Sequence, residues 1–373
     1  MVFSHPLANE SLIGVDIGSD SIKVVHAEMT RQGARILRVA VCPTPADSIK
    51  EGVVINVPEV AAAIQFAVRS AGIKATNAIA ATAGPGVIVR HVQLPKMTEQ
   101  LLRRSILYEA GKYISASVED SVVEFEILGD AEEQGQMNVM LVAAPRAVVD
   151  SRVQALERAG LETLAIDVEA FATFRALVEQ HPDQSLLEST VALLDMGASH
   201  TEINLVCKGR LALTRTVPIA GASLTNAVKT AENCTDAEAE QRKHSLDMAE
   251  LAKSSSGSAP NPGLKVLQSL IDEMLREVRR SINYYQSQLP DGAAETTVDR
   301  LILTGGTSRL KGLLSYAKSR LNVEVSIGNP GLRELMSSSP EDEFSEEDIP
   351  LLTVAFGLAV KEMSAAIRLS AAA

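Results

Sequence analysis

The chain has 373 residues, a length that favours two lobes over a single core. Hydrophobic residues make up 46% and charged residues 22%, as in folded globular proteins, and an aromatic content of only 3% implies aliphatic cores. The net charge of −12 at pH 7 argues against general nucleic-acid binding, because neutralising phosphates requires Lys and Arg.

We expect a cytoplasmic protein with no direct membrane span. The first ten residues lack a basic segment followed by an apolar one, so they do not resemble a signal peptide. The longest uncharged apolar stretch, residues 349–360, is shorter than the ~18 residues that a membrane-spanning helix needs. The three cysteines, Cys42, Cys207 and Cys234, are widely spaced and odd in number, which argues against a disulfide framework or a zinc site.

The first part of the chain alternates strands and helices. Residues 11–28 predict a strand, a tight turn and a second strand, and a helix over 57–72 has Asn56 as its candidate cap. A short buried strand follows over 78–84. Residues 85–165 then predict strand, helix, strand, strand and helix, the order of a compact α+β insert.

The second part repeats the alternation after a long helix predicted over 166–180. Its predicted elements are strands over 191–221, helices after them, a loop over 254–263, a long helix over 264–290, a strand, glycine turn and helix over 298–321, an acidic loop over 337–350 and a closing helix.

One motif occurs twice, about half a chain length apart. Asp16 and Asp195 each follow an apolar strand, and each is followed by an apolar residue and a glycine, Gly18 or Gly197, before a further strand. Either motif alone would be an ordinary hairpin turn. The matching pair instead predicts two similar loops that face each other across a cleft.

This pair of loops suits a nucleoside triphosphate. Glycine lets backbone N–H groups approach phosphate oxygens closely. Two facing Asp carboxylates can hold the hydration shell of Mg²⁺, and Lys23 can reach the phosphates as a point charge.

A third glycine element, Gly305-Gly306, follows the buried strand 301–304 and precedes a helix. A ligand could stack against its bare backbone, although a plain strand-to-helix turn would have the same pattern.

The three motifs together resemble the phosphate 1, phosphate 2 and adenosine motifs of the superfamily of actin, DnaK-type chaperones and sugar kinases. The resemblance implies an α/β, actin-like two-lobe ATPase fold, duplicated on an RNase H-like unit, that binds ATP or ADP with Mg²⁺. Asp16 and Asp195 would flank the metal through water. The residues implied for phosphate are Gly18, Ser19, Ser21, Lys23, Gly197 and Ala198, and those implied for adenosine are Lys243, Glu277, Arg280, Gly305 and Gly306.

Within this superfamily the chain resembles the PilM family of type IV pilus assembly proteins over about residues 12–361. The phrases that carry the resemblance are GVDIGSDSIKVV, YEAGKYISASVEDSVVEFEIL, LVAAPRAVVDSRVQALERAGL, IDVEAFATFRAL, REVRRSINYY and LTGGTSRLKGL. By this resemblance, the insert matches the extra subdomain of PilM and FtsA. The implied domains are a first lobe of 10–84 and 166–190 completed by a C-terminal helix over 351–368, an inserted subdomain of 85–165, and a second lobe of 191–350.

The resemblance also implies a function. It predicts an adaptor that binds the N-terminal cytoplasmic tail of the inner-membrane protein PilN, and so lies at the inner membrane within the pilus complex through a protein partner. A groove between the insert and the first lobe is the expected dock. Homo-oligomers are also compatible with this family.

Glu169 is the candidate for activating water near the terminal phosphate, with Asp167 as its competitor. Because the match at this position is loose, we expect at most slow hydrolysis.

Two other functions remain open from sequence. A sugar-type kinase of the same superfamily would need a substrate-side Asp base and polar sugar-binding residues, and no convincing set is found. An FtsA-like membrane-associated filament would need a basic amphipathic tail, whereas the segment 361–373 has only Lys361 and Arg368 as cations.

Overall fold

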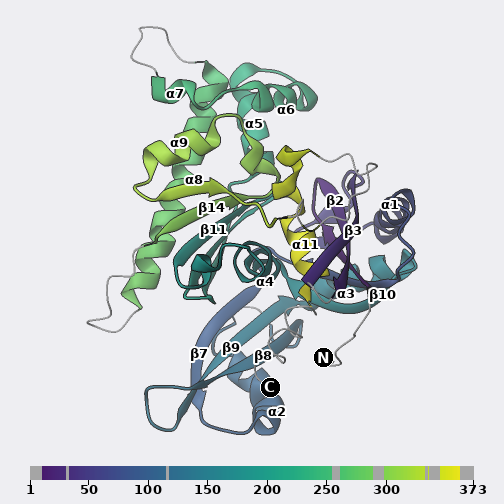
Figure 1. The fold of residues 1–373 in the computed structure, drawn as a ribbon, viewed down its shortest axis with the longest axis vertical. Helices are drawn as coiled ribbons and strands as arrows, with labels where there is room; N and C mark the ends of the chain where they lie inside the picture. Colours follow the sequence, from purple (N-terminus) through teal and green to yellow (C-terminus); the bar gives the residue numbers. More distant parts are fainter. Residues whose placement is uncertain are drawn as a thin grey trace.

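The computed structural model describes residues 11–30, 33–114, 117–253, 261–288, 298–331, 335 and 345–361. Two lobes, each built on a five-stranded sheet, lie side by side, and a smaller subdomain extends from them at the bottom of Figure 1. The duplication predicted from the repeated motif is therefore present in the fold.

The first sheet has the strand order β10-β6-β1-β2-β3. Strands β1, β2 and β3 form an antiparallel meander, whereas β6 and β10 run parallel to β1. The strands are β1 (Ser11–Ile17), β2 (Ser21–Thr30), β3 (Gly33–Pro43), β6 (Asn77–Thr82) and β10 (Glu162–Val168).

The second sheet repeats this arrangement with the order β13-β12-β11-β14-β15. Again the first three strands form a meander and the last two run parallel to the central strand. The strands are β11 (Thr190–Met196), β12 (Thr201–Cys207), β13 (Arg210–Val217), β14 (Arg300–Thr304) and β15 (Glu324–Ile327).

Helices α1 (Val57–Ser70) and α3 (Arg146–Arg158) cover the outer face of the first sheet. The α1 helix begins where predicted, because the Asn56 side chain accepts a hydrogen bond from the backbone N–H of Glu59 at 3.4 Å. Between α1 and the sheet lies an aliphatic core, as the low aromatic content implied. The short strands β4 (Ile49–Lys50) and β5 (Val53–Val54) pair beside this layer.

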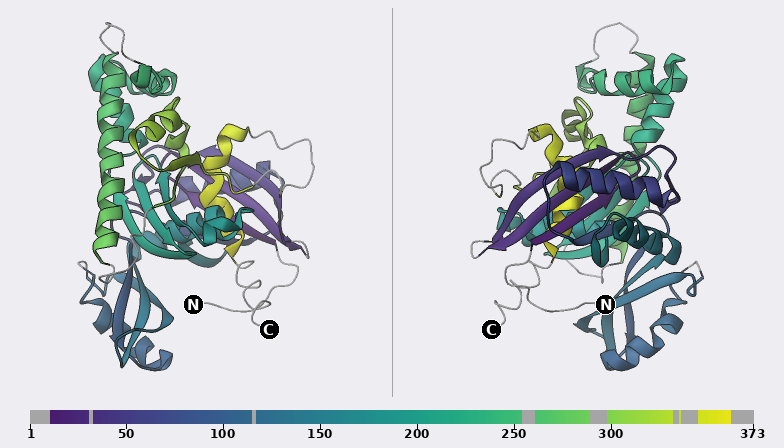
Figure 2. Two further views of the ribbon diagram at one scale, coloured as in Figure 1. Left: turned by 60° about the vertical axis from the view of Figure 1, so that its left-hand side comes forward. Right: turned by 90° about the vertical axis from the view of Figure 1, so that its right-hand side faces the viewer.

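The second sheet is covered on its outer face by α8 (Pro262–Ser287), the long helix in Figure 2. The Asn261 side chain caps this helix by accepting hydrogen bonds from the N–H groups of Gly263 and Leu264. The remaining helices of this lobe are α5 (Gly221–Glu232), α6 (Asp236–Ser245), α7 (Glu250–Lys253) and α9 (Leu313–Arg320), with short 3₁₀ turns at Gly306–Arg309 and Glu346–Leu352.

The inserted subdomain consists of β7 (Ile88–Pro95), α2 (Glu99–Ala110), β8 (Ser121–Asp130) and β9 (Gln136–Pro145). It forms a three-stranded sheet with its own aliphatic core. The insert predicted from sequence extends to residue 165, but α3 packs on α1 and β10 joins the first sheet. The subdomain therefore ends at Pro145, because the following residues bury their apolar side chains in the first lobe.

Two short helices lie between the sheets. They are α4 (Glu169–Phe174), which is followed by a π-helical turn over Arg175–Glu179, and α11 (Thr353–Ala359). The long helix predicted over 166–180 thus begins only at Glu169, since the preceding residues complete β10. The predicted closing helix has α11 as its first part, and residues 362–368 lie outside the described range.

The two helices cross at very short range. A Cβ atom on Gly357 of α11 would lie 2.6 Å from the carbonyl carbon of Ala172 of α4. A Cβ on Gly14 of β1 would likewise lie 2.6 Å from the backbone nitrogen of Ala359. Glycine is required at both positions because backbone meets backbone there.

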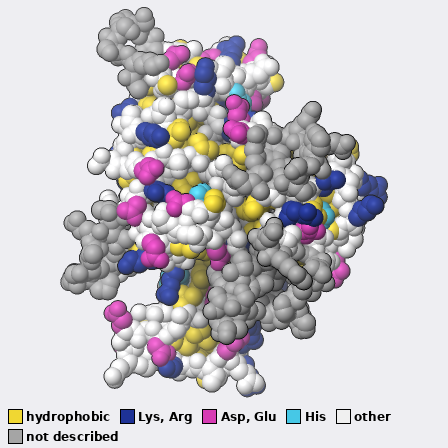
Figure 3. Space-filling model, viewed as in Figure 1, with side chains coloured by type: hydrophobic (Ala, Val, Ile, Leu, Met, Phe, Trp, Pro, Cys, Tyr) yellow, Lys and Arg dark blue, Asp and Glu magenta, His cyan; other side chains and the backbone are white. Residues whose placement is uncertain are grey.

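The surface view in Figure 3 shows basic and acidic side chains interspersed over one face. Among the described residues, no helix is long and apolar enough to cross a membrane.

Candidate functional site

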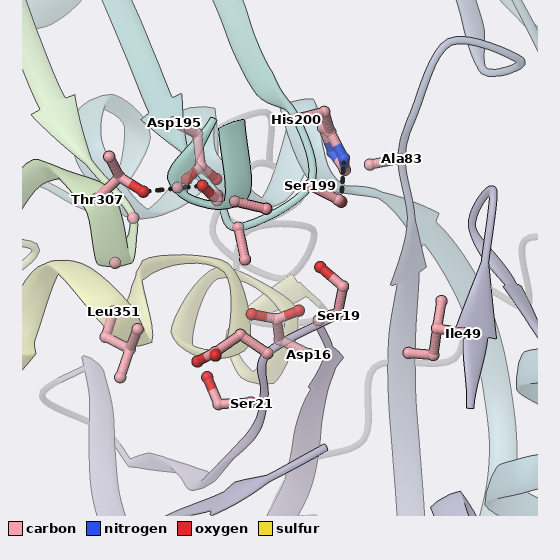
Figure 4. A pocket seen from close by; sticks show the side chains of 18 of the residues that line it. Asp16, Ser19, Ser21, Ile49, Ala83, Asp195, Ser199, His200, Thr307 and Leu351 are labelled. Carbon is pink, nitrogen blue, oxygen red and sulfur yellow. Dashed lines mark hydrogen bonds between the residues drawn. The ribbon is translucent and has the colours of Figure 1, made fainter. Parts of the chain in front are cut away.

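A cleft of about 1100 Å³ lies between the two lobes. The hairpins that follow β1 and β11 enter it from opposite sides, and the two aspartates face each other across it in Figure 4. Most residues that the sequence singled out line this cleft, namely Asp16, Gly18, Ser19, Ser21, Lys23, Glu169, Asp195, Gly197, Ala198, Lys243, Gly305 and Gly306.

The first loop is fixed from both sides. Asp16 and Lys23 are ladder partners in the β1–β2 hairpin, and their buried side chains form an ion pair at 3.1 Å. The hydroxyl of Thr44 donates a hydrogen bond to the carbonyl of Gly18 at 2.6 Å. A Cβ on Gly18 would lie 2.9 Å from the backbone carbonyl oxygen of Ser21, so glycine is favoured at this position of the loop.

The second loop is tied to its surroundings through Gly197. Its N–H donates to the carbonyl of His200 at 3.1 Å, which closes the β11–β12 turn. Its carbonyl accepts hydrogen bonds from the Thr307 hydroxyl at 2.9 Å and from the N–H of Gly221 at 3.0 Å. This loop is therefore held rigidly by the third glycine element and by the start of α5.

The third element packs against the second aspartate. Gly305 has a positive φ of 80°, and a Cβ there would collide with Asp195 Oδ1 and lie 2.7 Å from the Met196 carbonyl oxygen. The N–H of Gly305 donates to the carbonyl of Pro350 at 3.1 Å. Only glycine fits this position, and its bare backbone faces the cleft.

Of the two acidic candidates near the start of α4, only Glu169 lines the cleft. Its Oε2 atom lies 3.8 Å from Nε2 of His200, an ion-pair distance that joins the two lobes. Asp167 lies deeper and pairs with Arg175 at 3.1 Å and with Lys361 at 3.2 Å. The geometry therefore favours Glu169 over Asp167 as the group that could act on a ligand.

Two further acids share the floor of the cleft with Glu169. Asp195 and Glu202 are ladder partners, and the Glu202 side chain is almost completely buried. Burial, followed by the charges of Glu169 and Asp16, raises the pKa of Asp195 to about 7. Burial, with the charge of Glu169 next in importance, raises the pKa of Glu202 to about 8. Both carboxyl groups are therefore held protonated, in part or mostly, at neutral pH.

Cations partly offset this acidity. Burial opposes the charge of His200, but the interaction with Glu169 outweighs it and raises the pKa of His200 to about 9. Burial also opposes ionisation of Glu169, yet His200, Arg152 and Lys23 together lower its pKa. The pKa of Asp16 is raised, because burial outweighs the attraction of Lys23.

These residues fit a hydrated divalent cation. Glu202 Oε2 is buried without a hydrogen-bond partner among the described residues, and two neighbouring carboxyls have raised pKa values that a nearby cation would lower. No three His, Cys, Asp or Glu side chains in the described part of the chain are placed to bind a metal directly. A cation here would therefore be held largely through water and a bound anion, as Mg²⁺ commonly is.

Lys243 on α6 is buried and also lines the cleft. Its Nζ atom donates hydrogen bonds to Glu240 at 2.7 Å and to the Thr225 hydroxyl at 3.0 Å.

Glu277 and Arg280, which the resemblance placed at adenosine, are not among the residues that line the cleft. Glu277 instead pairs with Arg215 of β13 at 2.7 Å and also contacts Arg280. This stretch of α8 packs on the second sheet, where it contacts β13.

Sequence reasoning missed Arg152, His200 and Glu202. Arg152 reaches the cleft from α3, and its guanidinium donates to the carbonyls of Ala81 at 2.7 Å and Gly52 at 2.5 Å. No local pattern marks Arg152, since its position depends on the packing of α3. His200 and Glu202 lie within or directly after the second loop, so a closer inspection of that motif could have found both.

The duplicated sheets, the crossing helices and the cleft between the paired Asp–Gly loops define a two-lobed protein of the actin-like ATPase fold. Within that class the assignment is more specific. The chain belongs to the family of the type IV pilus assembly protein PilM, whose family model matches residues 14–363.

Known proteins of several names resemble this chain. A solved structure of the PilM-PilN type IV pilus biogenesis complex matches with a TM-score of 0.77 and 25% identity, covering 94% of this chain and 98% of that one. The cell division protein FtsA of Bacillus subtilis (strain 168) is 23% identical, over 86% of this chain and 79% of the relative. The ethanolamine utilization protein EutJ of Carboxydothermus hydrogenoformans matches with a TM-score of 0.55 and 18% identity, over 95% of this chain and 91% of its own, which shows a shared fold.

Proposed function

We propose that the cleft binds ATP or ADP with Mg²⁺ and that the chain is a cytoplasmic adaptor of type IV pilus assembly. The observation that carries the first part is the placement of Asp16 and Asp195. They occupy matching positions at the ends of the central strands of two like sheets, and both line one cleft. Mg²⁺ held between them would neutralise charge on the phosphates.

Different groups of the chain would contact different parts of the nucleotide. Backbone N–H groups of the two hairpins, at Gly18, Ser19 and Ala198, and the Ser21 hydroxyl would bind phosphate oxygens, with Lys23 as the balancing charge. Gly197, whose own N–H closes the β11–β12 turn, would let the phosphates approach the backbone closely. The adenosine would lie against the bare backbone of Gly305 and Gly306, and Lys243, which lines the same cleft, would also contact it. Glu277 and Arg280 have no part in this proposal, because they lie on the outer face of the sheet.

Hydrolysis by this site would be slow. Glu169 is the acidic side chain placed to accept a proton from water, but its pKa is lowered, because the charges of His200, Arg152 and Lys23 outweigh the effect of burial. A carboxylate with a lowered pKa is a weak general base. We therefore infer that nucleotide serves mainly to hold the two lobes together.

The adaptor role rests on the family and on the match to a chain of the PilM-PilN complex. By this proposal the chain binds the N-terminal cytoplasmic tail of PilN and is held at the inner membrane through that partner. The dock would be the junction of the insert with the first lobe, where β9 leads into α3.

Titration calorimetry with Mg·ADP and Mg·ATP tests the nucleotide site. Asp16→Asn and Asp195→Asn should each lower the affinity at least about tenfold, whereas Asp130→Asn, an exposed change in the insert, should leave it unchanged. Full affinity in both cleft variants would refute the assignment of the loops.

Fluorescence anisotropy with a labelled peptide of the PilN N-terminal tail tests the adaptor role separately. The peptide should bind saturably, and a scrambled peptide of the same composition should not. Equal binding of the two peptides, or none, would contradict the proposed partner while leaving nucleotide binding intact.

A further inference from the structure

The imidazole of His200 lines the cleft at one end of the row of charged groups. In Figure 4 it lies near Ala83, whereas Thr307 and Leu351 lie toward the opposite end, with Asp16 and Asp195 between. In this view the aspartates thus lie between His200 and Thr307, the residue that directly follows Gly306 in the chain.

We propose that His200 distinguishes a nucleoside triphosphate from a diphosphate in this cleft by exchanging its ion pair with Glu169 for one with the terminal phosphate. The inference rests on the proposed nucleotide binding and names the residue that would set its specificity. With the base near Gly305–Gly306 and Mg²⁺ near the paired aspartates, the phosphate chain extends toward His200.

The contacts of His200 leave one edge of the ring able to change partner. Its Nδ1 atom lies 3.0 Å from the Ser199 hydroxyl within the same loop, which fixes the ring orientation. Its Nε2 atom is 3.8 Å from Glu169 Oε2, longer than a hydrogen bond, and a quarter of the side chain is exposed. The Nε2 edge is thus loosely engaged and open to the cleft.

The surroundings keep the ring charged. The acidic groups that act on it come from three elements, Glu169 of α4, Glu202 of β12 and Asp195 of β11, while burial opposes them. The nearby cations Lys23 of β2 and Arg152 of α3 are themselves turned to Asp16 and to backbone carbonyls. A charged imidazole with only a distant partner is the cation best placed to meet a new anion.

A terminal phosphate carries more negative charge than the Glu169 carboxylate and presents more acceptor oxygens, so it competes effectively for the imidazolium. The diphosphate lacks this group, and the ion pair between the lobes persists. In the triphosphate state Glu169 loses its His200 partner, while Arg152 and Lys23 continue to lower its pKa and keep it a weak base. The exchange moves no covalent bond.

The test measures the affinities of Mg·ATP and Mg·ADP by titration calorimetry for the full chain and three variants. His200→Asn removes the charge and keeps a polar side chain. Glu169→Gln removes the competing carboxylate. His244→Asn is the matched control, because His244 also lines the cleft and also pairs with a glutamate, Glu240 at 3.0 Å, but sits on α6.

We expect His200→Asn to weaken Mg·ATP binding about tenfold and Mg·ADP binding less than about twofold. Glu169→Gln should strengthen Mg·ATP binding relative to Mg·ADP, and His244→Asn should leave the ratio of the two affinities unchanged. Retained ADP binding in His200→Asn also reports that the variant is folded.

Equal losses for both nucleotides in His200→Asn, or no loss, would overturn the inference and leave the proposed nucleotide site standing. The inference would also be overturned if His244→Asn changed the ratio of the Mg·ATP and Mg·ADP affinities as much as His200→Asn does. Failure of the unaltered chain to bind either nucleotide would instead remove the proposed function, and this inference with it.

Discussion

Lys23 and Glu202 occupy equivalent positions in the two lobes: each is the ladder partner of a cleft aspartate, Asp16 in the first hairpin and Asp195 in the second. The duplicated hairpins thus carry opposite charges at the same place. The first aspartate has its counter-charge at 3.1 Å, whereas the second lies beside another acid. A bound cation would therefore stabilise the second hairpin more than the first, because it would reduce the repulsion between Asp195 and Glu202.

The pH dependence of stability follows from this excess of acid. Asp195 and Glu202 have ordinary pKa values of 3.8 and 4.5, raised to about 7 and about 8 in the fold, and His200 rises from 6.5 to about 9. All three hold protons more tightly when folded, so the contribution of each is fully present below its ordinary pKa and is lost progressively as pH rises from that value to the raised one. We expect the melting temperature of the nucleotide-free chain to fall between about pH 6 and pH 9, as measured by circular dichroism.

Glu202→Gln should flatten that slope. The amide keeps the size of the side chain and removes the charge that is unfavourable above about pH 8. At pH 8 the variant should melt roughly 2–4 °C above the unaltered chain, while Glu162→Gln, at an exposed site on β10, should not. A variant that melts lower at pH 8 would show that the ionised form of Glu202 is satisfied in the fold.

Gly305→Ala should destabilise the fold and weaken nucleotide binding. An added methyl would collide with Asp195 Oδ1 and occupy a backbone conformation with φ of 80°. The matched control is Gly160→Ala, where φ is 86° but nothing lies within 4 Å of the added carbon. The backbone cost is about 1–2 kcal/mol for the control, and Gly305→Ala should exceed it in urea unfolding. Equal losses of unfolding free energy in the two variants would mean that the loop carrying Asp195 moves aside without strain.

Thr307→Val tests how the second loop is held. The Thr307 hydroxyl donates to the Gly197 carbonyl at 2.9 Å, and valine keeps the shape without the donor. We expect a loss of about 1 kcal/mol of unfolding free energy and a several-fold loss of affinity for both nucleotides alike. If calorimetry shows unchanged affinities, this hydrogen bond is not needed for the second loop to bind nucleotide.

Arg152→Met tests the buried guanidinium that links α3 to the strands beneath it. Its hydrogen bonds to Ala81 and Gly52 would be lost, leaving buried carbonyls unpaired, at a cost of about 2–4 kcal/mol in chemical unfolding. Arg152→Lys should recover little of this, because one amine cannot replace the forked geometry. Full recovery by lysine would show that only the charge matters.

Much of the fold could be predicted because its signals are local. The cap at Asn56 marks the start of α1, and Gly18 and Gly197 mark matching turns. Apolar strands before each Asp–Gly pair sufficed to predict the cleft between two like loops.

The remainder depends on contacts between distant segments. Asp167 and Glu169 are nearly adjacent in sequence, yet Lys361 and Arg175 bind the first, leaving the second in the cleft. The side of the second sheet on which α8 packs decides that Glu277 meets Arg215 and not a ligand. No pattern within a single element carries this information.

The backbones of α11 and α4 meet at Gly357 and Ala172, in the layer between the two sheets. The inserted subdomain is attached to the first lobe, and its strand β7 also touches β13 of the second. Asp16 belongs to the first sheet and Asp195 to the second. Because the insert contacts both lobes, a change in the distance between these two carboxylates would also change how β7 lies against β13, and this contact gives the insert a route by which it could respond to a ligand in the cleft.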